Sequence, residues 1–125
     1  MEIRELRATL KARDFDRTCH FYGSVLALSS LSSRDSAAGR STIFQAGAAQ
    51  IEVTGLAHGK DPSLGYHPPD APMVLTMVVA SAEAVYQELI FRDRNIPGGL
   101  RRDSAGRAVY ETNDPDGVKI RFVEE

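Results

Sequence analysis

The sequence lacks the residues that mark several classes of protein. Its single cysteine, Cys19, excludes an internal disulfide, and no cysteine or histidine pair has zinc-finger spacing. No apolar run approaches the roughly 20 residues that cross a bilayer. The net charge of -2 gives no cationic excess to attract nucleic acid. We therefore expect no nucleic-acid or membrane partner.

The opening residues also lack a secretory signal. Residues 1–14, MEIRELRATLKARD, contain no apolar stretch and no small-residue cleavage site. A reducing, cytoplasmic location is the expectation that fits both this and the lone cysteine. The 125 residues, 42% of them hydrophobic, suffice for one compact domain with its own core.

The first half of the chain predicts a strand, a helix and three further strands. Apolar and polar residues alternate over 5–12, which predicts a strand with one buried face. Asp14 is a typical N-cap for the helix that follows. The apolar stripe expected on that helix consists of Phe15, Cys19, Tyr22 and Leu26. The three strands are expected at 29–34, 41–46 and 49–54.

The second half repeats this order after a linker. Residues 55–72 are rich in glycine and proline and show neither helical nor strand periodicity. A strand is then expected at 73–80, followed by a helix capped by Ser81. Three more strands are expected at 100–103, 108–112 and 118–123. The repetition predicts an α+β domain over 1–125, with modules at 1–55 and 72–125 and a linker loop at 56–71.

Three short segments carry a resemblance to a known family. They are Asp14-Phe15-Asp16-Arg17 followed by His20-Phe21-Tyr22, then Phe44-Gln45-Ala46-Gly47 followed by Ile51-Glu52-Val53, and finally Asn113-Asp114-Pro115-Asp116-Gly117 followed by Ile120. In this order they resemble the glyoxalase/bleomycin resistance/dioxygenase (vicinal oxygen chelate) superfamily. The resemblance implies two tandem βαβββ modules that form a curled mixed sheet, with helices outside and a functional site in the cleft.

The resemblance also indicates where metal-using members hold their metal. The four ligand positions correspond to Arg7, Glu52, Val74 and Arg121. Of these, only Glu52 offers a lone pair, because arginine stays protonated and valine has no donor atom. We therefore expect no metal and no other cofactor.

Strand alternation then gives a set of candidate ligand-binding residues. Side chains of one parity face the cleft and those of the other parity face the helices. The set is Arg7, Thr9, Glu52, Val74, Thr76, Lys119 and Arg121, with Tyr110 depending on strand register and His67 from the linker loop. We expect Arg7 and Arg121 to flank Glu52. That cluster either only stabilises the interior or leaves an arginine free to bind an anionic group.

Three functions remain open at this level. The first is a metal-independent small-molecule-binding protein, similar to the antibiotic-binding resistance proteins of the superfamily, which holds an anionic or aromatic ligand in the cleft between sheets. The resemblance implies a homodimer for such a protein. The second is a lyase, isomerase or dioxygenase-like enzyme that uses Glu52. The third is a dimerising structural module without a tight ligand. Metal-dependent glyoxalase or dioxygenase activity is not expected.

Overall fold

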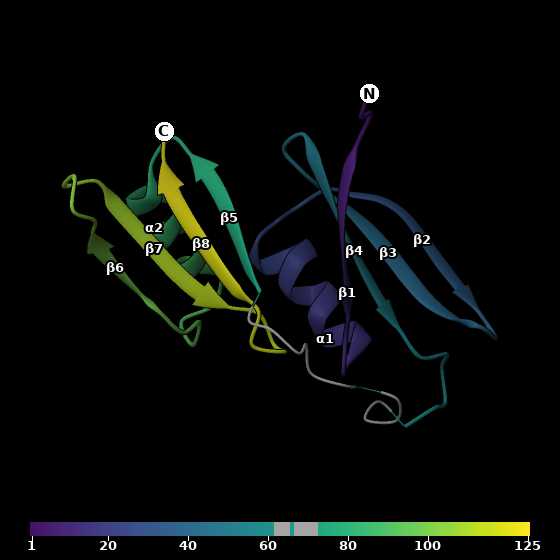
Figure 1. The fold of residues 1–125 in the computed structure, drawn as a ribbon. Coiled ribbons are helices and arrows are strands. Elements are labelled where there is room, and N and C mark those ends of the chain that lie inside the picture. The colour runs from purple at the N-terminus through teal and green to yellow at the C-terminus, as the bar shows by residue number, and fades with distance from the viewer. Residues whose placement is uncertain (62–65, 67–72) are drawn as a thin grey trace. The chain divides into compact units, whose positions relative to one another are not determined.

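The chain forms two compact units, each with one four-stranded sheet. The computed structural model describes residues 1–61, 66 and 73–125. The units are Met1–Pro68 and Pro69–Glu125 (Figure 1). His67, one of the expected ligand contacts, lies outside the described residues.

The first unit joins strands from both ends of its sequence into one sheet. Its elements are β1 (Leu6–Lys11), α1 (Phe15–His20), the π-helical turn η1 (Phe21–Val25), β2 (Ser30–Ser36), β3 (Gly39–Ala46) and β4 (Ala49–Gly55). The strand order is β1-β4-β3-β2. The β1–β4 pair is parallel, whereas the β3–β4 and β2–β3 pairs are antiparallel. The parallel pair places two strands far apart in the sequence side by side.

The second unit has the same topology. Its elements are β5 (Val74–Val79), α2 (Ala82–Arg92), β6 (Gly99–Arg102), β7 (Ala108–Asn113) and β8 (Lys119–Glu124), and the strand order is β5-β8-β7-β6. Again the first and last strands pair in parallel. The predicted α+β class and the duplicated βαβββ arrangement are confirmed. No helix within 1–61 or 73–125 is long and apolar enough to cross a membrane.

Both predicted helix caps are present. The Asp14 carboxylate accepts a hydrogen bond from the Arg17 amide at 3.2 Å, and the Ser81 hydroxyl accepts one from the Ala84 amide at 3.1 Å. Each cap satisfies a backbone N–H group that has no partner inside the helix.

The buried stripe of the first helix differs from the predicted one. Its buried residues are Thr18, Phe21, Tyr22 and Val25, so only Tyr22 was placed correctly. Phe15 is not a core residue because it lies in the first turn, where the Arg40 guanidinium stacks 4.6 Å from its ring centre. The apolar spacing gave the correct helical period but the wrong phase.

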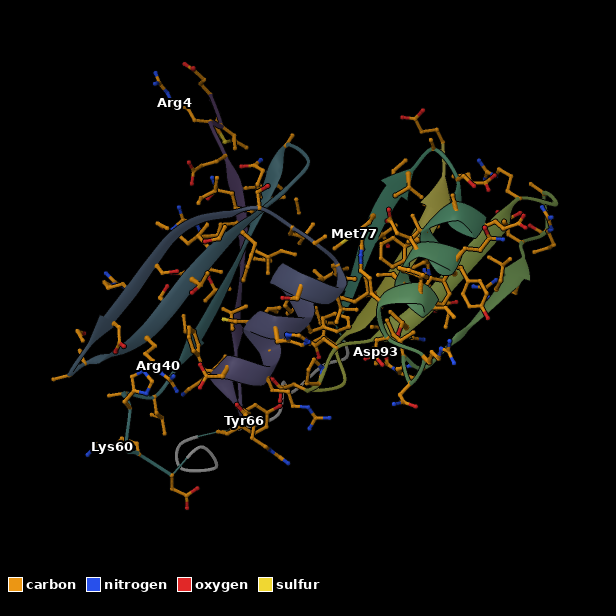
Figure 2. The ribbon with its side chains drawn as sticks, turned by 180° about the vertical axis from the view of Figure 1, so that it is seen from behind. Arg4, Arg40, Lys60, Tyr66, Met77 and Asp93 are labelled. Carbon is orange, nitrogen blue, oxygen red and sulfur yellow. The ribbon has the colours of Figure 1, made fainter. Side chains whose placement is uncertain are left out.

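Each sheet is packed against helix on one face only. In the first unit Leu10, Phe44, Ile51 and Val53 are buried. In the second unit the buried side chains include Leu89 of α2 with Ala108, Tyr110, Ile120 and Phe122 of the sheet. Figure 2 shows α2 lying across its sheet. Because neighbouring residues of a strand point to opposite faces, the remaining side chains line a helix-free face in each unit.

Gly98 allows the chain to pass close to β7 just before β6 begins. Gly98 has φ of +102°, and a Cβ atom built on it would lie 1.8 Å from the backbone oxygen of Glu111. The following residue, Gly99, pairs with Glu111 across β6 and β7. The chain can approach β7 this closely only because residue 98 has no side chain.

Replacing Gly98 by alanine should therefore destabilise the protein by at least ~2 kcal/mol, through the left-handed φ and the clash with Glu111. The measurement is urea unfolding followed by circular dichroism. Gly99→Ala is the matched control, since nothing lies within 4 Å of a Cβ at that position. Equal stability of the two variants would contradict this account of β6.

Candidate functional site

The helix-free face of the first unit centres on the Glu52 carboxylate. The β1–β4 register places Thr9 directly beside Glu52. The Thr9 hydroxyl donates to Glu52 Oε1 at 3.2 Å, and the Ser41 hydroxyl donates to Oε2 at 2.8 Å. Both carboxylate oxygens are thus oriented by neutral hydroxyl groups. Ser41 is 7% exposed, so one side of the carboxylate is held by a buried donor.

Arg7 lies on the same face but has other partners. Its Nε donates to Gln50 Oε1 at 3.1 Å and its Nη2 to Glu5 Oε2 at 2.8 Å. The expected pairing of Arg7 with Glu52 is therefore wrong. The reason is register: Arg7 lies opposite Gln50, whereas Thr9 lies opposite Glu52. Hydroxyl groups from Thr9 and Ser41 fill the place that the sequence assigned to a guanidinium group.

The helix-free face of the second unit centres on a carboxylate that the sequence analysis missed. Glu111 of β7 pairs across the sheet with Arg121 of β8. Arg101 Nε donates to Glu111 Oε1 at 3.0 Å. Lys119 Nζ and Arg121 Nη2 lie 3.5 Å and 3.6 Å from Oε2. We call Arg101, Glu111, Lys119 and Arg121 the Glu111 cluster.

The three cations stabilise the charged form of Glu111. The hydrogen bond from Arg101 is the largest cause that holds the pKa of Glu111 below its ordinary value of 4.5. Burial opposes this by raising the pKa, and the charges of Arg121, Arg101 and Lys119 lower it further. The carboxylate therefore stays ionised over the whole neutral range.

Arg121 is the least satisfied member of the Glu111 cluster. Its ion pair of 3.6 Å is longer than a hydrogen bond. Its Nε is buried and finds no acceptor among the residues that the structure describes. A buried donor without a partner costs about 1–3 kcal/mol. An additional hydrogen-bond acceptor for the Arg121 guanidinium group would therefore lower the free energy of the folded protein.

Apolar and hydroxyl side chains of β5 border the cations of β8. Thr76 lies beside Arg121 and Val74 beside Lys119 in the parallel register. Val74 is 42% exposed and Val78 is 61% exposed, both on the helix-free face. The structure thus brings the candidates Val74, Thr76, Lys119 and Arg121 together on one surface.

Tyr110 does not belong to this surface. Its side chain is fully buried, with its ring 5.0 Å from that of Tyr86 on α2 and stacked at 5.8 Å on Phe122. Its hydroxyl donates to the Pro97 carbonyl at 3.3 Å. Expecting Tyr110 at the ligand site was an error of parity, because β7 turns Glu111, and not Tyr110, away from the helix.

The two histidines that the structure describes are exposed and pair with neither Glu52 nor Glu111. His20 is exposed on α1. His58 forms an exposed ion pair with Asp35, at 3.1 Å. His67 lies outside the described residues, so its expected role in ligand binding stays a prediction.

The residues at the four metal-ligand positions do not fit a divalent metal. Arg7 donates to Glu5 and Gln50, Arg121 forms an ion pair with Glu111, Val74 has no donor atom, and Glu52 alone offers oxygen. Across the described ranges, no three His, Cys, Asp or Glu side chains gather as a ligand group. A divalent ion needs several such ligands at once.

Acid should weaken the Glu111 cluster. A carboxylate with a lowered pKa stabilises the fold above the unfolded value, near 4.5, and loses that contribution as the pH falls through its folded pKa. Glu111→Gln should remove about 1 kcal/mol of stability at neutral pH and flatten the acid dependence. Urea unfolding between about pH 6 and about pH 3 measures both. Parallel curves for the two proteins would contradict the role of Glu111.

Comparison with known proteins places the fold. No family model and no curated protein sequence matches the chain. Among solved structures, glyoxalase I of Leishmania major has a TM-score of 0.73 at 20% identity, with 99% of this chain and 88% of that chain covered. A glyoxalase family protein of Enterococcus faecalis has 0.71 at 20% identity, covering 98% and 97%. A glyoxalase/bleomycin resistance protein of Catenulispora acidiphila has 0.69 at 17% identity, covering 97% of both. The chain therefore has the fold of the glyoxalase/bleomycin resistance/dioxygenase superfamily, as its three sequence segments indicated.

Proposed function

We propose that this chain is a metal-independent small-molecule-binding protein. The observation that carries the proposal is the arginine found at two of the four metal-ligand positions. Arg7 donates to Glu5 and Gln50, and Arg121 forms an ion pair with Glu111, all within their own units. A cation at such a position repels a metal ion instead of binding it.

Glu52 does not compensate for this loss. A single carboxylate supplies at most two ligand atoms, and both Glu52 oxygens already accept hydrogen bonds. Recruiting a metal would break these hydrogen bonds without offering enough ligands to replace the hydration shell of the ion. The proposal therefore assigns the helix-free faces to ligands that accept or donate hydrogen bonds.

These faces have the composition of small-molecule sites. Oriented polar groups lie beside apolar side chains that are partly exposed, namely Val74 and Val78. Ligand sites combine a few fixed polar groups with apolar area in this way. The exposed valines also favour the predicted homodimer, because association would cover them. The homodimer and the cytoplasmic location stay predictions.

Metal analysis tests the proposal directly. The purified protein should contain no stoichiometric Zn, Ni, Fe or Mn, and thermal-shift titration with these ions and Mg²⁺ should leave the melting temperature within about 1 °C. Stoichiometric metal together with a rise of several degrees would refute metal independence. Glu52→Gln distinguishes the source of any shift, because loss of the shift in this variant would locate the ion at Glu52.

A second candidate function is catalysis by Glu52 without a metal. It is favoured by the two hydroxyl groups that orient this carboxylate, since a general base must be held toward the proton it takes. Solved neighbours include a glyoxalase I of Leishmania major.

A glyoxalase I assay in excess EDTA tests this alternative. The binding-protein proposal predicts no turnover above background. Turnover that persists in EDTA, falls at least ~100-fold in Glu52→Gln and is unchanged in Glu83→Gln would establish the enzyme instead. Glu83 is a suitable control because it lies in the first turn of α2.

A further inference from the structure

The Glu111 cluster contains more positive than negative charge. Three cationic side chains, Arg101, Lys119 and Arg121, surround one carboxylate. All three are on the helix-free face, where strand register aligns Arg121 with Glu111 and places Thr76 beside Arg121. One carboxylate leaves an excess of two positive charges, although the whole chain has a net charge of -2.

We propose that this cluster binds the phosphate group of a small phosphate monoester. The proposal rests on the function proposed above and names the ligand class for the second unit. A phosphate monoester carries a charge of about -1.5 to -2 at neutral pH, which balances the excess of two, whereas a carboxylate balances half of it. Its oxygens also accept several N–H groups at once.

The cations have different roles in this site. Arg101 is held by Glu111 through Nε and Nη2, so it is a fixed part of the frame. Lys119 and Arg121 approach Glu111 only at 3.5 Å and 3.6 Å. These two have donors to spare, because neither side chain is within ordinary hydrogen-bond distance of Glu111. The incoming phosphate therefore engages Lys119 and Arg121.

Glu111 acts as a resident competitor for the same cations. It keeps Arg101, Lys119 and Arg121 close together despite their mutual repulsion. It also offers them an acceptor that the phosphate must share. Its removal should therefore have opposite effects on stability and on phosphate binding.

The neighbouring surface indicates an apolar body for the ligand. Val74 lies beside Lys119, and Val78, four residues further along β5, lies beside Val123. Both are exposed, and the Thr76 hydroxyl lies between them in the strand. A compact apolar group attached to the phosphate would cover one of these valines, which favours a monoester over free phosphate.

The test uses the full chain with two probes, inorganic phosphate and phenyl phosphate. Isothermal titration calorimetry is run in EDTA at about pH 7.5, where phosphate is mostly dianionic, with chloride keeping the ionic strength constant. We expect phenyl phosphate to bind at least ~5-fold more tightly than phosphate, because of the valines. Arg121→Met should weaken both at least ~10-fold.

Arg102→Met is the matched control. Arg102 is the neighbour of Arg101 on β6, and its Nη1 donates to the Gly106 carbonyl at 3.2 Å, away from the cluster. The substitution removes the same charge from the same sheet but outside the cluster, so its effect should stay within ~2-fold. Equal weakening by the two variants would show binding by diffuse surface charge and overturn the site. Each variant is checked by thermal unfolding, and Lys119→Met replaces Arg121→Met if the latter does not fold.

The Glu111→Gln variant distinguishes a phosphate-binding site from a purely structural ion-pair network. The variant should be less stable than the parent but bind phenyl phosphate ~3-fold or more tightly, because the resident carboxylate no longer competes. Weaker or unchanged binding would mean that the cluster is only a structural ion-pair network, and would overturn the proposal.

A further probe separates this inference from the proposed function. Phenylacetate binding that depends on Arg121, with no binding of either phosphate probe, would overturn the phosphate assignment and leave small-molecule binding intact. Stoichiometric metal in the protein would refute the proposed function, while the titration in EDTA would still report on the cluster.

Discussion

The structure depends on a parallel pairing between the first and last strand of each unit. In both units these strands are separated in sequence by a helix and two other strands, and their register decides which side chains become neighbours. It places Thr9 beside Glu52 and Thr76 beside Arg121. The helix then covers the opposite face, so the apolar side chains form a core and the polar ones are left together. The polar face of each unit therefore results from the same strand pairing and helix packing that form its core.

The duplicated topology puts opposite charges at equivalent positions. Glu52 and Arg121 occupy the same place in β4 and β8, each beside a threonine of the first strand. Their charges are compensated differently. Glu52 accepts from two hydroxyl groups, whereas Arg121 belongs to an ion-pair cluster around Glu111. Hydroxyl groups orient a charge without cancelling it, while a carboxylate largely neutralises a cation. The two faces thus differ in chemistry despite their common fold.

The sequence was sufficient for the elements and their order, because period-two alternation, N-caps at Asp14 and Ser81, and glycine-rich breaks are local signals. It was insufficient where two strands had to be aligned. The misplaced Arg7–Glu52 pair came from a resemblance that fixes positions along the chain but not the atoms that side chains contact. Tyr110 was assigned to the wrong face because the parity of β7 is undetermined until its register with β8 is known.

Glu111 was missed for a related reason. None of the three segments that carry the resemblance includes it, and a glutamate in a strand is usually solvated. A signal was nevertheless present: β7 precedes β8 across a tight turn, so antiparallel pairing about that turn sets Glu111 opposite Arg121. Complementary charge at paired positions is a usable criterion once two strands are known to be neighbours.

The contact between Arg121 and Glu111 also constrains how this protein can change. Installing a glutamate at position 121 would set two carboxylates opposite each other and remove the ion pair between Arg121 and Glu111. A histidine at position 7 would likewise deprive Glu5 and Gln50 of their donor. Each single step toward a metal site therefore removes existing contacts before any metal affinity is gained. The contacts of Arg7 and Arg121 would therefore oppose their replacement during evolution.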